Sequence, residues 1–87
     1  MNQKESKTRV LVVDDEPSIV EFLSRRLKSW GYETLTATGG ESGLRMAEEE
    51  RPDLVLLDIV MPGVNGREVC SRLKTRSATS DIPVIFL

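Results

Sequence analysis

The chain has 87 residues, a length that accommodates one small domain with a single hydrophobic core. It contains no His and one Cys, which excludes Ser-His-Asp and Cys-His nucleophile systems and zinc sites built from His or Cys. Its 12 basic and 14 acidic residues are interspersed and give a net charge of -2, so we expect no direct binding to nucleic acid. Because the chain has no His and only one Cys, any bound metal ion must be held by oxygen ligands.

The longest apolar runs are four residues long, at 10–13, 54–57 and 84–87. A membrane span needs about 20 predominantly apolar residues, and a signal peptide needs an apolar core of about 7–15. We therefore expect no membrane segment and no secretory leader. A single Cys cannot form an intrachain disulfide, which favours a cytoplasmic location.

A polar segment at 1–8 is expected to be a tail before a domain at 9–87. The run at 10–13 does not alternate with polar residues, which predicts a strand buried on both faces. Pro17 then predicts the start of a helix, and Gly31 predicts its end. Its expected apolar face, at helical spacing, consists of Ile19, Leu23, Leu27 and Trp30, with Trp30 anchoring the end of the helix.

The next predicted elements are again a strand and a helix in turn. Residues 32–38 are β-prone, Gly39 and Gly40 form a turn, and 41–50 has a helical pattern with an exposed run of three glutamates at its end. A strand at 54–59 is followed by a Pro/Gly/Asn loop at 61–66 and by a third helix in which Cys70 is a buried apolar residue. A polar connection at 74–81 leads to a fourth strand at 83–87.

The order βαβαβαβ predicts an α/β fold: a doubly wound parallel sheet between helices, in three α/β/α layers. In such sheets the site lies at the carboxyl ends of the strands that flank the reversal of strand order. If the order begins 2-1-3, Asp14 and Asp15 after the first strand meet Asp58 after the third. Three carboxylates with open water positions suit Mg²⁺, which predicts a metal-dependent phosphoryl site.

A second interpretation of the acidic pair stays open, because Asp14 or Asp15 could instead cap the helix that starts near Pro17. Asp58 is harder to explain structurally, since a carboxylate at the end of an apolar strand is costly without a partner. Other phosphate-binding motifs are not supported. The glycines at 39–43 lack G-x-G-x-x-G spacing, no G-K-[ST] occurs, and Val60 stands where haloacid-dehalogenase-like phosphatases have a second Asp.

Three segments carry a resemblance to a known family: Arg-Val-Leu-Val-Val-Asp-Asp-Glu-Pro at 9–17, Asp-Leu-Val-Leu-Leu-Asp at 53–58, and Met-Pro-Gly at 61–63 followed by Gly66. Over residues 9–87 the chain resembles the receiver domains of two-component response regulators. The resemblance implies a flavodoxin-like fold with strand order 2-1-3-4 and no fifth strand within this sequence. It implies a signalling module, not an enzyme, that accepts a phosphoryl group on Asp58 from a histidine kinase or phosphotransfer protein in a Mg²⁺-dependent reaction.

The resemblance also implies the metal ligands. Asp15 would bind Mg²⁺ directly, Asp14 would act through water, Asp58 would contribute its carboxylate, and Val60 its backbone carbonyl. The family's Ser or Thr after the fourth strand and its Lys after a fifth strand are not among residues 1–87, so we expect slow phosphorylation of this chain.

The alternative function is a phosphorylation-incompetent interaction module, with no chemistry of its own. We also expect self-association through the fourth strand at 83–87, which would form an exposed apolar edge. The sequence does not identify the output domain or the cognate kinase.

Overall fold

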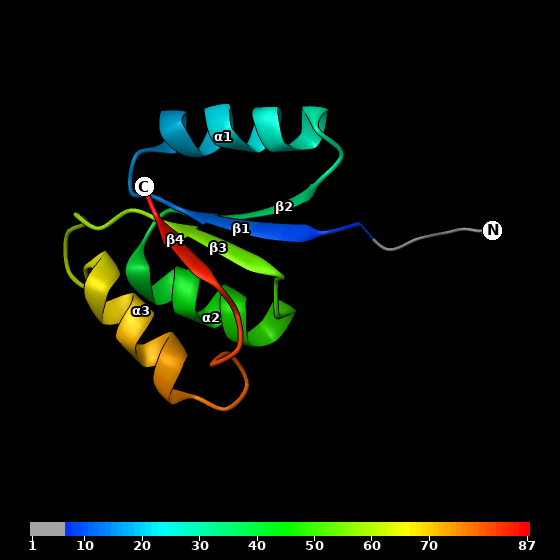
Figure 1. Cartoon of the computed structure of the whole chain (residues 1–87). Coiled ribbons are helices and arrows are strands. Elements are labelled where there is room, and N and C mark those ends of the chain that lie inside the picture. The colour runs from blue at the N-terminus through cyan, green and yellow to red at the C-terminus, as the bar shows by residue number, and fades with distance from the viewer. Residues whose placement is uncertain (1–6) are drawn as a thin grey trace.

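The structure is a computed structural model that describes residues 7–87. The predicted tail at 1–8 therefore lies largely outside the described residues. The seven elements follow the predicted order (Figure 1). They are β1 Arg9–Val13, α1 Pro17–Ser29, β2 Glu33–Ala37, α2 Gly40–Glu50, β3 Leu54–Leu57, α3 Gly66–Thr75 and β4 Val84–Phe86.

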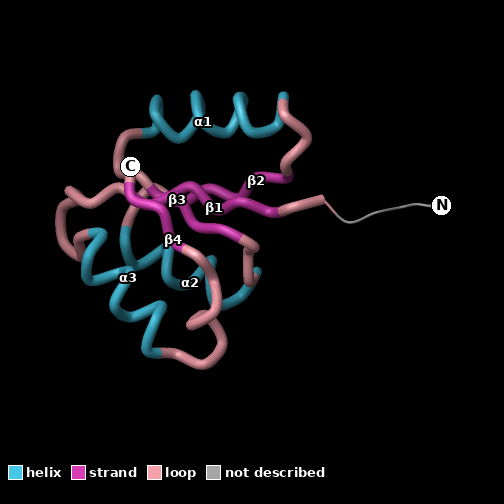
Figure 2. The backbone as a smooth tube through the Cα atoms, viewed as in Figure 1, coloured by secondary structure: helices cyan, strands magenta, loops and turns pink. Residues whose placement is uncertain are grey.

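The four strands form one parallel sheet in the order β2-β1-β3-β4. Helix α1 covers one face of the sheet, and α2 and α3 cover the other (Figures 1 and 2). The predicted three-layer, doubly wound fold is confirmed. No helix within residues 7–87 is long and apolar enough to cross a membrane.

Strand β1 lies in the middle of the fold and is buried on both faces. Val10 and Val12 pack toward α1, while Leu11 and Val13 pack into a larger core with α2 and α3. All four side chains are at most 1% exposed. Burial on both faces explains why the run at 10–13 shows no polar alternation.

The predicted apolar face of α1 is partly wrong. Val20 and Leu27 are buried and Leu23 packs against them, but Ile19 is 37% exposed and Trp30 is 67% exposed. Trp30 is the C-cap residue, and its backbone N–H bonds to carbonyls of the last turn while its side chain does not anchor the helix end in the core. The helix does end as predicted, with Gly31 at a φ of 94°.

Four smaller differences concern the ends of two strands and the burial of two side chains. Strand β3 ends at Leu57, two residues before the predicted boundary, and β4 comprises only Val84–Phe86. The glutamate run is not uniformly solvated, since Glu48 is half-buried and forms an ion pair with Arg76. Cys70 is half-buried against the larger core rather than fully buried.

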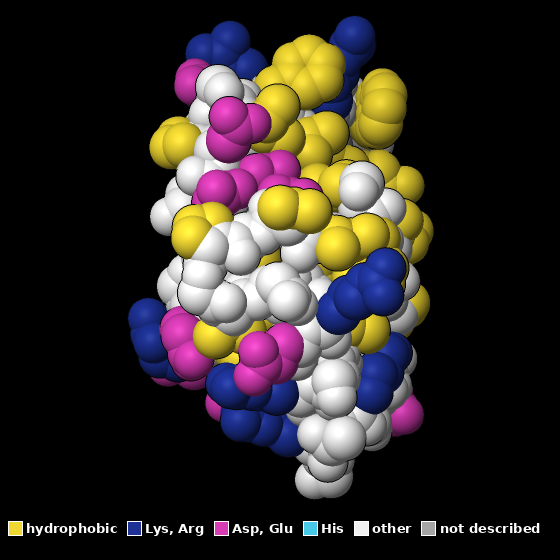
Figure 3. Space-filling model, turned by 90° about the vertical axis from the view of Figure 1, so that its left-hand side faces the viewer, with side chains coloured by type: hydrophobic (Ala, Val, Ile, Leu, Met, Phe, Trp, Pro, Cys, Tyr) yellow, Lys and Arg dark blue, Asp and Glu magenta, His cyan; other side chains and the backbone are white. Residues whose placement is uncertain are grey.

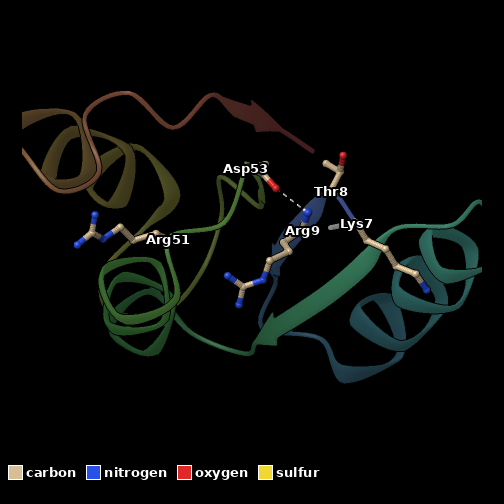
Figure 4. A pocket seen from close by; sticks show the side chains of 5 residues that line it. All are labelled: Lys7, Thr8, Arg9, Arg51 and Asp53. Atoms are coloured by element: carbon tan, nitrogen blue, oxygen red, sulfur yellow. Dashed lines mark hydrogen bonds between the residues drawn. The ribbon is translucent and has the colours of Figure 1, made fainter. Parts of the chain in front are cut away.

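At the amino ends of the strands, contacts fix where β1 begins. The Arg9 backbone N–H donates to Asp53 at 2.8 Å, and its guanidinium donates to the Glu50 backbone carbonyl and carboxylate at 2.6 and 2.7 Å. Figure 4 shows Arg9 and Asp53 in the pocket that they line with Lys7, Thr8 and Arg51. This polar end of the sheet lies opposite the end where β1 and β3 terminate.

Candidate metal centre at the carboxyl ends of the strands

Asp14, Asp15 and Asp58 form one cluster. One carboxylate oxygen from each lies within 4.8 Å of the others. Figure 3 views the molecule from this end, and acidic side chains gather below α1 with hydrophobic side chains beside them. The predicted convergence of these three residues, distant in sequence, is therefore present in the fold.

The sheet register produces the cluster. Val13 of β1 is level with Leu57 of β3, so the residues that follow each of them leave the sheet side by side. The Asp58 backbone N–H donates to the Val13 carbonyl at 2.9 Å, and the Asp14 N–H donates to the Ala37 carbonyl at 3.2 Å. These bonds continue the ladder one residue past the strands and hold both aspartates at the sheet edge.

Asp14 is the most buried of the three carboxylates, with 6% exposure. Burial raises the pKa of Asp14, the hydrogen bond from the Glu16 backbone N–H lowers it, and the charges of Asp58 and Asp15 raise it further. Within residues 7–87 no ion pair of a Lys or Arg involves any of the three. The cluster is thus a concentration of negative charge that a cation would stabilise.

The capping interpretation of the acidic pair does not fit the geometry. Glu16 occupies the N-cap position of α1, and its side chain makes no capping hydrogen bond. Asp14 instead accepts the Glu16 backbone N–H at 3.0 Å, before the helix begins. Neither Asp14 nor Asp15 occupies the capping position, so both carboxylates remain available to the cluster.

Asp58 begins a loop that returns to α3. Its side chain is oriented by the Val60 backbone N–H, which donates to Asp58 Oδ1 at 3.3 Å. The Val60 side chain is 80% exposed, whereas the next residue, Met61, is buried in the larger core. This alternation holds the loop against the protein while leaving Val60 at the surface beside the cluster.

Two glycines that shape this loop are missed when the sequence is read alone. The pattern places Gly40 and Gly66 in turns, but each is the first residue of a helix and lies against the backbone of the loop. No signal in the sequence distinguishes them from turn glycines, because the backbone atoms that each contacts become its neighbours only once the chain has folded.

The family model for the response regulator receiver domain matches residues 10–87. The chain belongs to this family. It is 43% identical over 79 residues to the alkaline phosphatase synthesis transcriptional regulatory protein PhoP of Bacillus subtilis, covering 91% of this chain and 32% of that protein. Receiver domains are signalling domains, and this one spans about a third of the length of such curated relatives.

Solved receiver domains share the fold. The N-terminal domain of a response regulator receiver protein from Methanoculleus marisnigri JR1 is 46% identical, with a TM-score of 0.88 over 90% of this chain and 63% of that chain. The receiver domain of a sensor histidine kinase from Pseudomonas aeruginosa is 25% identical, with a TM-score of 0.87 over 93% of this chain and 66% of that chain. That domain has a magnesium ion coordinated in its active-site cleft.

Proposed function

We propose that this receiver domain accepts a phosphoryl group on the Asp58 carboxylate in a Mg²⁺-dependent reaction. The observation that carries the proposal is the cluster of three carboxylates whose oxygens lie within 4.8 Å of one another. Phosphoryl transfer needs an in-line nucleophile and a cation that neutralises the phosphoryl oxygens. Asp58 supplies the first, and the cluster offers a site for the second.

The residues fit Mg²⁺ by their chemistry. Mg²⁺ prefers oxygen ligands, keeps several waters, and is usually bound through one or two carboxylates together with a phosphate. We assign direct ligation to Asp15 and Asp58, water-mediated ligation to Asp14, and a further ligand to the Val60 backbone carbonyl. When bound, the ion would offset the negative charge of the carboxylates and of the incoming phosphoryl group.

We assign the role of the nucleophile to Asp58. It is half-buried, so an incoming donor can reach it, and its Oδ1 is held by the Val60 N–H. In the proposed step a carboxylate oxygen bonds to phosphorus as the bond between phosphorus and the donor breaks. Asp14, whose Oδ1 accepts the Glu16 N–H, adds a further negative charge within 4.8 Å that favours a divalent cation.

The proposed donor is a histidine kinase or phosphotransfer protein, and the proposed location is the cytoplasm. Membership of the receiver family, whose relatives include transcriptional regulators, supports both assignments. The family's hydroxyl and ammonium groups, which bind phosphoryl oxygens, have no counterpart within residues 1–87. Losing one electrostatic donor typically costs about 10²–10³ in rate, so labelling of the 87-residue chain should be slow.

Chemical labelling tests the proposal. The chain is incubated with acetyl phosphate and Mg²⁺, the acyl phosphate is trapped by borohydride reduction, and the modified residue is identified by mass spectrometry. We expect label on Asp58, none in Asp58→Asn, and none with a chelator. Asp53→Asn is the matched control, since it makes the same change at the other end of β3. Label on another residue, or a rate independent of Mg²⁺, would overturn the proposal.

The alternative, an interaction module without phosphorylation, is favoured by one observation. Ile85 and Phe86 of β4 and the adjacent Leu87 are 51%, 42% and 47% exposed, although they form an apolar run. An edge of this kind pairs readily with another chain. Self-association together with no Asp58 label, even after prolonged incubation, would support this second function over the first.

A further inference from the structure

Two glycines from different helices lie against the loop that carries Asp58. We call residues 58–66 the acceptor loop. A Cβ on Gly66, the first residue of α3, would lie 2.1 Å from the Asp58 carbonyl oxygen and 2.7 Å from the Ile59 Cα. A Cβ on Gly40, the first residue of α2, would lie 2.4 Å from the Val64 carbonyl oxygen and 2.9 Å from the Val64 Cβ. Both positions therefore have room only for glycine.

The two contacts hold opposite parts of the loop. Gly66 lies against the start of the loop at Asp58 and Ile59. The Gly66 backbone N–H also donates to the Ile59 carbonyl at 2.8 Å. Gly40 supports its far part at Val64, which packs against the larger core. Helices α2 and α3 lie side by side under the same face of the sheet, so the loop is supported from both (Figures 1 and 2).

We propose that Gly40 and Gly66 are positioning residues for the candidate metal centre. They would act through the acceptor loop by setting where the Asp58 carboxylate and the Val60 backbone lie. The proposal rests on the proposed function, because it assigns the loop's geometry to metal and phosphoryl binding. It differs from a purely structural role, in which each glycine would serve only the start of its own helix.

The size of the expected displacement can be worked out from the contacts. Ordinary van der Waals contact begins at 3.4 Å, so a methyl group on Gly40 would have to push the Val64 carbonyl away by roughly 1 Å. The shift for Gly66 would be larger and would act on the backbone of Asp58 itself. Mg²⁺ demands near-ideal octahedral geometry, so even part of this displacement, passed along the loop to Asp58 or to the Val60 backbone carbonyl, would weaken metal binding.

The variants Gly40→Ala and Gly66→Ala test the proposal in the 87-residue chain. Gly31→Ala is the control, because Gly31 lies at the far end of α1 with a φ of 94°, and a Cβ there would meet no atom within 4 Å. This control strains the backbone and lowers the melting temperature without touching the loop. Circular dichroism first establishes that each variant is folded.

Two measurements are then made. Calorimetric titration with Mg²⁺ should show an affinity lowered about 10- to 100-fold in both loop variants, as for other changes that support metal ligands, and unchanged in the control. Hydrogen exchange without metal should be faster across 58–66 in both loop variants. Unchanged exchange in the loop, or loss of Mg²⁺ affinity in Gly31→Ala as large as in the loop variants, would overturn the proposal.

The outcomes separate this inference from the proposed function. If the wild-type chain binds no Mg²⁺, the proposed function fails, and exchange across the acceptor loop still decides whether the glycines position Asp58. If Gly66→Ala does not fold, Gly40→Ala decides alone, because Val64 is only half-buried and can move outward. Wild-type Mg²⁺ affinity in a folded Gly40→Ala variant with unchanged exchange contradicts the inference while leaving Asp58 as the acceptor.

Discussion

Replacing Asp14 by Asn should make the metal-free chain more stable and weaken its response to Mg²⁺. Asp14 is 6% exposed, and one of its oxygens lies within 4.8 Å of oxygens of both Asp15 and Asp58. The substitution removes one of three charges but keeps an oxygen that can accept the Glu16 N–H, now bonded at 3.0 Å. The local backbone geometry should therefore survive the change.

The magnitude follows from opposing contributions. Two unit charges roughly 5 Å apart repel by about 1 kcal/mol in water and about 3 kcal/mol at an effective dielectric constant near 20. Asp15 and Asp58 are half-buried, so solvent screening favours the lower figure, and two pairs give about 2 kcal/mol. A buried amide with an unpaired N–H costs about 1 kcal/mol or more. The net gain is about 1 kcal/mol, which raises the melting temperature of a domain this small by about 4–8 °C.

Thermal melts with and without Mg²⁺ measure both effects. At a Mg²⁺ concentration ten times the dissociation constant, binding stabilises the wild-type chain by about 1.4 kcal/mol. Without metal, Asp14→Asn should have a higher melting temperature than the wild-type chain. Mg²⁺ should raise the melting temperature of the variant less than that of the wild type. Asp81→Asn, at an exposed carboxylate outside the cluster, should match the wild type in both respects. A lower metal-free melting temperature with an unchanged Mg²⁺ shift would refute the reasoning, because it would make Asp14 a structural residue.

Three further predictions concern the scaffold. Thr79→Val should cost about 1–2 kcal/mol in urea unfolding, because the fully buried hydroxyl donates to the Leu73 carbonyl at 2.7 Å; an unchanged midpoint would contradict this. Asn65→Ala should cost about 1 kcal/mol by removing the cap on the Glu68 N–H, whereas Asn65→Asp should retain it. Ile85→Lys should reduce self-association in light scattering, and a wild-type chain that stays monomeric at high concentration would show that no such association exists.

The candidate site was predictable because it depends on strand ends and strand order. An apolar run followed directly by Asp occurs at 10–14 and again at 54–58, and parallel strands place their carboxyl ends at one sheet edge. The β1–β3 pairing then brings Asp14 and Asp58 together whatever the details of the helices. The identity of the acids and their convergence could both be inferred before the fold was known.

The buried face of α1 could not be inferred in the same way. Two apolar stripes follow helical spacing on this helix, one through Val20, Leu23 and Leu27 and another through Ile19, Phe22 and Trp30. Periodicity identifies both, but only packing decides which faces the sheet. The first stripe lies over Val10 and Val12, and Phe22 of the second is 56% exposed.

The role of the two glycines that contact the acceptor loop could not be predicted from the sequence either. Gly40 and Gly66 are indistinguishable in sequence from turn glycines, because the atoms that exclude a Cβ belong to residues of the loop between β3 and α3. That proximity exists only after α2 and α3 pack under the sheet.

In strand β4 the sequence pattern is clear, but the burial of its side chains in the fold matches that pattern only in part. Its unalternated apolar run is typical of a strand covered on both faces. Val84 packs into the core shared with α2 and α3, but Ile85, level with Leu56, lies on the α1 side and is 51% exposed. Helix α1 lies over β1 and β2 and leaves that part of the sheet open (Figure 1). The apolar composition of β4 is therefore typical of a strand covered on both faces, whereas within residues 7–87 its α1 side is left half exposed. This difference is the physical basis for expecting β4 to associate with another surface.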